Sequence, residues 1–207
     1  MTSKATIGSA AKERNGLSPK DFVFIAVFGI LLFLVFMAFS IIFSANANLC
    51  WFTHTVGALF AGTVFMYLAY RVPKRGAIAI MGIIVGAVGL LMGMFSRGPA
   101  GIVGGGIVAD LIAGAPQNGT KTKLICAFAA FTFCFWLGQI SLILMMGEAY
   151  AEMCVQAGMT LEYGQTLVNS ILSPMGVVTG AATIAGGLVG GFIGTKVFSK
   201  HFAKLGM

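Results

Sequence analysis

The chain has 207 residues, of which 58% are hydrophobic and only 9% are charged, and its mean hydropathy is +0.95. Soluble domains carry about a quarter charged residues, and a chain this short cannot hide so much apolar surface from water. We therefore predict an all-α integral membrane protein, and we interpret its net charge of +7 as a sign of membrane orientation rather than of nucleic-acid binding.

Apolar runs long enough to cross a membrane alternate along the chain with short polar connections. A polar, basic segment over 1–20 precedes the first run, and Ser18 before Pro19 is typical of a helix start. The remainder, 21–207, is predicted to be one membrane domain in a compact bundle. We expect six membrane-spanning helices, at about 22–43, 53–70, 76–95, 98–114, 124–146 and 174–198.

The positions of the basic residues predict the orientation of these six helices. Twelve of the thirteen Lys and Arg residues fall on one side of the predicted spans, and only Arg97 falls on the other. Cytoplasmic loops are enriched in Lys and Arg, so we expect both termini in the cytoplasm. The long outer connection over 147–173 is too apolar for disorder beside a membrane, and it predicts a short lid or a re-entrant segment.

Small residues recur every four positions in two of the predicted spans. Such rows let the backbones of membrane helices approach closely, and we interpret them mainly as packing within this chain, with contact to a partner membrane subunit as the alternative. The rows contain Gly186, Gly190 and Gly194, then Gly187 and Gly191, and finally Gly82 and Gly86.

Asp110 is the single acid in the predicted span over 98–114. It lies about 18 Å from the outer start of that span at 1.5 Å per residue, which is past the middle of a core about 30 Å thick. An ion pair or a helix-end contact near the inner surface is one interpretation, with partners in 71–75 or 121–123. Proton coupling is the alternative, but the spans contain no second acid for a relay.

Polar residues of the three outer connections are expected to converge over one end of the bundle. Trp51 and His54 each have an alternative as a membrane-interface residue, and Arg97 fits either a substrate carboxylate or an ion pair with Glu148 or Glu152. The spacing of the cysteines predicts no metal site, and whether Cys50 pairs with Cys154 stays open. The candidate substrate-binding residues are Asn46, Asn48, Trp51, His54, Arg97, Glu148, Tyr163 and Asn169.

Three stretches carry a resemblance to a known family: "YRVPKRGAIAIMGIIVGAVGLLMG", "GGGIVADLIAG" and "GGLVGGFIGTKVFSKHFAKLGM". In order and spacing they resemble the Trep_Strep (MptD-like) family of small integral membrane proteins, from about Ser18 to the C-terminus. That family is regarded as substrate-binding S components of energy-coupling factor (ECF) importers. The resemblance implies six helices in a bacterial plasma membrane, a coupling subunit and two ATPase subunits as partners, and a lid over the ligand.

Better-known S components contact the coupling subunit through small residues spaced as AxxxA on the first helix. Here Ala26 and Gly29 are three residues apart, so the motif differs, and we expect these two residues, with Asp110, to serve docking or the inner end of the bundle. No catalytic motif is present in the sequence, and we expect a transport subunit rather than an enzyme. The cargo is expected to be a vitamin, a precursor or a haem or metal complex, with no resident cofactor. A stand-alone transporter or channel and a structural assembly protein are the alternatives.

Overall fold

The computed structural model describes residues 16–95, 97–114 and 120–204, with side chains up to Phe198, and this part of the chain is entirely helical and irregular, without strands. Most of the basic segment expected over 1–20 lies outside the described residues. The elements are α1 (Pro19–Phe43), the 3₁₀-helix η1 (Cys50–Phe52), α2 (Thr53–Arg71), α3 (Ala77–Leu91), α4 (Arg97–Ala113), α5 (Lys121–Met146), α6 (Ala149–Gln156), α7 (Leu161–Leu172) and α8 (Pro174–Lys204).

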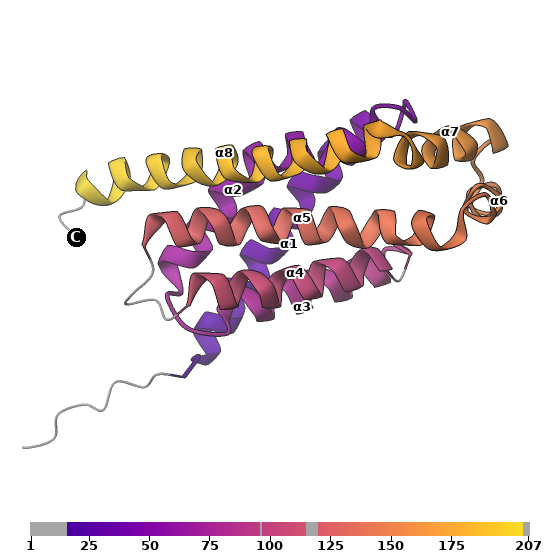
Figure 1. Ribbon diagram of the computed structural model, residues 1–207. Helices are drawn as coiled ribbons and strands as arrows, with labels where there is room; N and C mark the ends of the chain where they lie inside the picture. The colour runs from indigo at the N-terminus through magenta and orange to yellow at the C-terminus, as the bar shows by residue number, and fades with distance from the viewer. Residues whose placement is uncertain (1–15, 96, 115–119, 205–207) are drawn as a thin grey trace, which may run out of the picture.

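Among the described residues, four helical segments are long and apolar enough to cross a membrane: Pro19–Phe43, Cys50–Arg71, Lys121–Met146 and Pro174–Phe198. The apolar helix α3 has 15 residues and α4 has 17, so each is shorter than the roughly 20 residues that a spanning helix usually needs. α4 nevertheless packs along α5, and α3 packs against α4 and α1 (Figure 1). The described part of the chain is therefore a bundle of six helices, α1 to α5 and α8, of which α3 and α4 are the shortest, with the still shorter helices α6 and α7 at one end.

Local sequence signals account for where several helices begin. Ser18 and Asp21 form a reciprocal capping box at the start of α1: the Asp21 carboxylate accepts the Ser18 N–H at 2.7 Å, and the Ser18 hydroxyl oxygen accepts the Asp21 N–H. Thr120 is the N-cap residue of α5 and Thr160 that of α7, and each side chain accepts a hydrogen bond from a backbone N–H of the first turn. The predicted helix start at Ser18 is confirmed.

The glycine rows pack helices of this chain against one another. A Cβ atom on Gly194 would lie 2.6 Å from the carbonyl oxygen of Gly62, so α8 touches the backbone of α2. A Cβ on Gly187 would lie 2.7 Å from the Cα of Ala129 in α5. The α8 row that ends at Gly194 thus faces α2, and the parallel row that contains Gly187 faces α5. In the same way, α3 and α4 meet where their glycines coincide, at Gly82 and Gly106.

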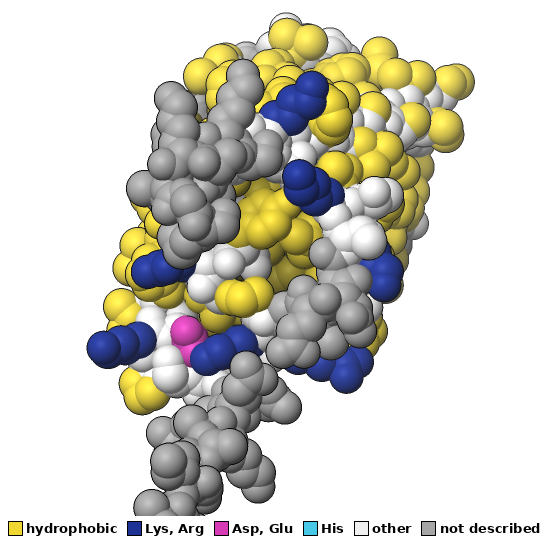
Figure 2. Space-filling view, turned by 90° about the vertical axis from the view of Figure 1, so that its left-hand side faces the viewer, with side chains coloured by type: hydrophobic (Ala, Val, Ile, Leu, Met, Phe, Trp, Pro, Cys, Tyr) yellow, Lys and Arg dark blue, Asp and Glu magenta, His cyan; other side chains and the backbone are white. Residues whose placement is uncertain are grey.

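The two ends of the bundle differ in charge. The connection between α2 and α3 and the start of α5 lie at one end, and Figure 2 shows Lys and Arg side chains around an apolar surface there. We call this the basic end. Lys74 in that connection forms an ion pair of 2.7 Å with Asp21 of α1. The helices α6 and α7 lie at the opposite end (Figure 1), which we call the lid end.

The connection expected over 147–173 is mostly helical. Gly147 ends α5 with a φ of 55°, and α6 and α7 follow, packed against each other. Leu167, Val168 and Ile171 of α7 face a buried cluster that also holds Trp51 and Tyr150. The segment thus has an apolar underside fixed to the bundle.

Candidate ligand-binding site

Two neighbouring pockets open at the lid end. The first has a volume of about 170 Å³, and we call it the His54 pocket; the second, of about 210 Å³, we call the Trp51 pocket. Met94 and Gln139 line both, so the two pockets adjoin. The His54 pocket is lined by Phe33, Phe36, Met37, Ser40, Cys50, Thr53, His54, Met94, Phe135 and Gln139, and the Trp51 pocket by Trp51, Gly93, Met94, Phe95, Gly98, Gln139, Leu142 and Tyr150.

Three residues that line these pockets each have a buried polar side-chain atom with no hydrogen-bond partner among the described residues. These atoms are Nε1 of Trp51, Oγ1 of Thr53 and Nδ1 of His54, and their residues are only 4%, 5% and 3% exposed. Native proteins satisfy the great majority of their buried polar atoms, and each exception needs an explanation. A ligand that supplies the missing partners would explain all three.

Trp51 and His54 are therefore the two predicted substrate-binding residues that line these two pockets. The His54 ring packs edge-on to Phe135, with ring centroids 4.7 Å apart, and also lies near Phe36. These contacts hold the imidazole in the wall of the His54 pocket. Trp51 is in η1, which places its ring in the wall of the adjoining pocket.

Asn46, Asn48 and Tyr163 hold the connection after α1 in place and line neither pocket. The Asn46 side-chain oxygen accepts the Asn48 N–H at 2.9 Å, and the Ser170 hydroxyl donates to the Asn48 side chain at 3.2 Å. The Tyr163 hydroxyl donates to the Ser44 carbonyl at 2.7 Å. These bonds fasten α7 to the residues between α1 and η1, so their role is to position the lid.

The charged candidates lie apart from the two pockets. Arg97 begins α4, is exposed and lines neither pocket, and within the described residues it forms no ion pair with Glu148 or Glu152. Glu148 and Asn169 line a separate pocket of about 90 Å³ between α6 and α7. The eight candidates therefore lie at the lid end but do not share one pocket, and their role in binding stays a prediction.

Several residues of the site were missed from the sequence. Gln139 is a lone amide in the apolar run of α5, and it is the polar residue that both pockets share. Its isolation among apolar neighbours was a usable signal, of the same kind that singled out Asp110. Phe135 gave no such signal, since apolar residues occupy most positions of α5, and Met94 likewise lies beside an apolar neighbour, Phe95, in the connection between α3 and α4.

The cysteines near the site are free thiols. Cys154 of α6 is fully buried, and Cys50 is half-buried and lines the His54 pocket. Burial raises the pKa of Cys154 and that of Tyr150, which lies beside it. Both groups therefore stay protonated and neutral at physiological pH. Within the described residues, no group of three His, Cys, Asp or Glu side chains is placed to hold a metal ion.

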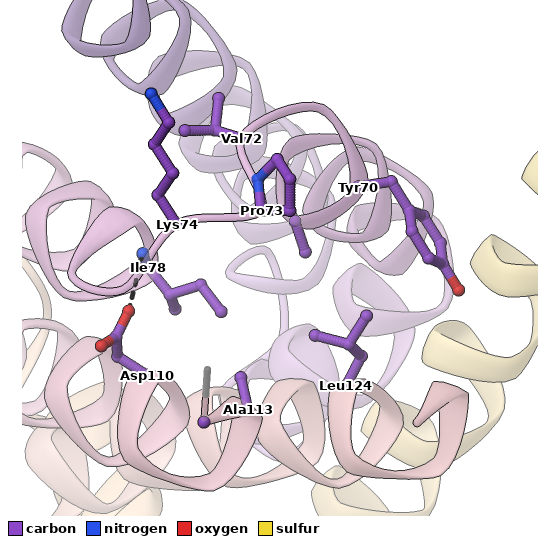
Figure 3. A pocket seen from close by; sticks show the side chains of 10 residues that line it. Tyr70, Val72, Pro73, Lys74, Ile78, Asp110, Ala113 and Leu124 are labelled. Atoms are coloured by element: carbon purple, nitrogen blue, oxygen red, sulfur yellow. Dashed lines mark hydrogen bonds between the residues drawn. The ribbon is translucent and has the colours of Figure 1, made fainter. Parts of the chain in front are cut away.

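Asp110 caps a helix at the basic end, far from both pockets. Its carboxylate accepts the Gly76 N–H at 3.0 Å and the Ile78 N–H at 3.2 Å, at the start of α3 (Figure 3). Gly76 has a φ of 89°, which favours glycine. The sequence left open whether Asp110 forms an ion pair or a helix-end contact, and the structure shows a helix-end contact at the start of α3. Lys74 points away from Asp110 in Figure 3, and its ion-pair partner is Asp21.

A small pocket of about 90 Å³ adjoins this cap. Ile78 and Leu124 line it, and Figure 3 shows both side chains directed toward its centre. Tyr70 also lines it, and its buried hydroxyl has no partner among the described residues. Because this pocket is smaller than either pocket at the lid end, it offers the weaker candidate for a ligand.

We predict that Asp110→Asn destabilises the protein without changing ligand affinity. The substitution removes the negative charge and one acceptor oxygen from the start of α3, and hydrogen bonds to charged groups contribute about 1.5–3 kcal/mol. We expect the free energy of unfolding to fall by about 1–2 kcal/mol. Thermal unfolding in detergent measures this, with the exposed Glu152→Gln as a control that has little effect. A large loss of ligand affinity in Asp110→Asn would contradict the assignment.

The two small residues of α1 differ in their surroundings. Gly29 is buried against α3: a Cβ there would lie 3.2 Å from the side chains of Met81 and Val85. Gly29 therefore serves packing within the chain and is not on a free face. Ala26 is half-buried on the same helix.

The helical bundle, with four segments long and apolar enough to span a bilayer, defines a multi-pass membrane protein. The family model described as "Hypothetical bacterial integral membrane protein (Trep_Strep)" matches residues 19–204. The chain belongs to this family. No curated protein and no solved structure matches it.

Proposed function

We propose that this chain is the substrate-capturing membrane subunit of an ECF-type importer, and that it binds a small molecule at the lid end. The observation that carries the proposal is that three residues lining two adjoining pockets each have a buried polar atom without a hydrogen-bond partner among the described residues. Sites for small molecules combine apolar and aromatic walls with a few placed polar groups, and this composition fits that description.

The orientation follows from the charge difference between the ends. In our proposal all six long helices cross the bacterial plasma membrane, and the basic end faces the cytoplasm. The pockets then open toward the outside, beneath α6 and α7. ATP hydrolysis occurs in two partner ATPases, and the chain itself performs no chemistry. A transmembrane coupling subunit joins it to them, as the resemblance to S components implies.

A stand-alone proton-coupled transporter fits the structure less well. Asp110, the acid on which proton coupling would depend, is engaged in capping α3 through two backbone N–H groups. His54 lies within the wall of a pocket at the lid end rather than beside Asp110. The arrangement therefore supports binding at one end of the bundle more than an ion path through it.

Native mass spectrometry of gently purified protein tests the proposal. We expect a fraction of the molecules to carry a bound small molecule, and a coupling subunit and ATPases to co-purify with the chain when it is extracted from its own membrane. A chain that carries neither ligand nor partner subunits under these conditions would contradict the proposed function.

We also predict that Tyr163→Phe speeds ligand release. The Tyr163 hydroxyl fastens α7 to Ser44, and burial raises the pKa of Tyr163 to about 12, so the hydroxyl stays a donor at physiological pH. Loss of one such bond costs about 1 kcal/mol, which we expect to appear as a dissociation rate roughly fivefold faster. Stopped-flow dissociation measures it, with Tyr67→Phe on α2 as control. An unchanged rate would show that α7 does not act as a lid.

A further inference from the structure

We infer that the captured molecule is uncharged and flat, about two fused rings in size, with one edge that both donates and accepts hydrogen bonds. This inference rests on the proposed function and specifies the class of its substrate. Three features of the two pockets carry it: the absence of charge on their walls, their size and shape, and the position of Gln139.

The first feature is charge. No Lys, Arg, Asp or Glu among the described residues lines the His54 pocket or the Trp51 pocket. The described charged residues of the lid end are all exposed instead: Arg97, Glu148, Glu152 and Glu162. An ion that enters a dry pocket without an opposite charge loses several kcal/mol of hydration free energy. An ionised cargo would therefore bind poorly here, and an uncharged one pays no such penalty.

The second feature is size and shape. Cavities of about 150 Å³ in other proteins hold a single benzene ring, and the His54 pocket measures about 170 Å³. The Trp51 pocket adds a space of about 210 Å³ next to it. Phe36 and Phe135 meet edge to face, with centroids 5.4 Å apart, in the wall of the first. Aromatic walls favour stacked or edge-on rings, so each pocket suits one planar ring.

The third feature is the polar edge between the pockets. Gln139 lines both, and its amide offers one acceptor and two N–H donors. No hydrogen bond from this side chain to another described residue is present, and it is half-buried. His54 and Thr53, with unpartnered Nδ1 and Oγ1 atoms, line one of these pockets, and Trp51, with its unpartnered donor Nε1, lines the other. A lactam or similar edge would pair with the Gln139 amide.

The same features disfavour haem, one of the cargoes considered from the sequence. His54 and Met94 line one pocket, as an axial pair would require. A haem, however, carries two propionates, and the described part of the walls offers no Lys or Arg to receive them. A free carboxylate on any other cargo meets the same obstacle.

The two tryptophans of the chain provide a direct test. Trp51 lines a pocket, whereas Trp136 lines neither. We would titrate ligand-free protein with quinazolin-4-one, an uncharged bicyclic lactam, and in parallel with its 7-carboxylate, which is an anion at pH 7. We expect quinazolin-4-one to change the fluorescence saturably, in wild type and in Trp136→Phe but not in Trp51→Phe. The carboxylate should bind at least ~10-fold more weakly.

Gln139→Leu distinguishes the polar edge from simple apolar packing. The substitution should weaken quinazolin-4-one binding ~10-fold, because the lactam edge would be left unpaired. Naphthalene has no polar edge, so it should bind Gln139→Leu at least as tightly as it binds wild type. The inference would be overturned if the carboxylate bound wild type as tightly as quinazolin-4-one or more tightly. It would also be overturned if Gln139→Leu bound quinazolin-4-one as tightly as wild type does, or if wild type did not bind quinazolin-4-one at millimolar concentration.

The outcome separates this inference from the proposed function. A charged molecule or haem found by native mass spectrometry in the purified protein would overturn the substrate class and leave small-molecule capture intact. An uncharged ring compound found there would support both. A protein that neither carries nor binds any small molecule would overturn the proposed function itself.

Discussion

Replacing His54 by leucine should lower ligand occupancy ~10-fold or more and leave the ligand-free protein nearly as stable as wild type. The His54 Nδ1 has no partner in the ligand-free chain, so its removal breaks no bond there. A bound ligand would lose a buried hydrogen bond worth about 1–3 kcal/mol. Native mass spectrometry gives the fraction of molecules that carry ligand, and thermal unfolding gives the stability.

A matched control exists at the opposite end of the bundle. The Tyr70 hydroxyl is also buried without a partner among the described residues, but it lines the small pocket at the basic end. Tyr70→Phe therefore removes the same kind of atom and should leave occupancy unchanged. If His54→Leu keeps wild-type occupancy, or if both variants lose it equally, His54 is a core residue and not part of a binding site.

Substitution of Gly190 should have the largest effect on stability. A Cβ atom there would lie 2.8 Å from the carbonyl carbon of Ala58 and 3.0 Å from the Cα of Leu59. Both are backbone atoms of α2 and cannot rotate away, so α8 must separate from α2. Overpacking of a close interface costs about 1–3 kcal/mol and sometimes more, and we expect Gly190→Ala to reach about 3 kcal/mol.

Gly104 provides the comparison for this substitution. It also lies in a helix, but a Cβ there would meet nothing within 4 Å. Gly104→Ala should therefore be neutral or slightly stabilising, since alanine favours the helix. A thiol-reactive dye that follows exposure of the buried Cys154 on heating, in a chain whose other three cysteines are replaced by serine, measures both variants. Equal melting temperatures for Gly190→Ala and wild type would contradict the close contact of α8 with α2.

The long helices were predictable because their apolar runs end at polar or charged residues. The fifth predicted span, 124–146, differs from α5 only by the first turn, where Lys121 and Lys123 lie beyond the apolar run. The glycine rows likewise indicated close packing, and the Gly194–Gly62 contact confirms it. Hydrophobic pattern and small-residue spacing are local features, so one sequence is enough to read them.

The lid was predicted only as a segment, because its helices are short and amphipathic rather than continuously apolar. Thr160 caps α7, and Leu167, Val168 and Ile171 fall on one face of that helix. This pattern is typical of an amphipathic helix, but the prediction of a lid or re-entrant segment did not use it.

The binding site was less predictable than the fold. Polar residues in outer connections can either bind a ligand or hold a loop in place by hydrogen bonds. The same types of side chain serve both roles, so the sequence does not tell the two roles apart. Asn48 and Tyr163 turned out to brace α7, whereas His54 lines a pocket. Only the packing of helices distant in sequence separates these cases, and that packing brings Gln139 to the boundary between the two pockets.

The side of the membrane on which the pockets open tests the account most directly. Single cysteines would replace Gln165 on α7 or Lys123 at the start of α5 in an otherwise cysteine-free chain, since both positions are exposed. A membrane-impermeant maleimide should label Gln165→Cys in intact cells and Lys123→Cys only in inside-out vesicles. The reverse pattern would place the His54 and Trp51 pockets on the cytoplasmic side and contradict capture of a molecule from outside.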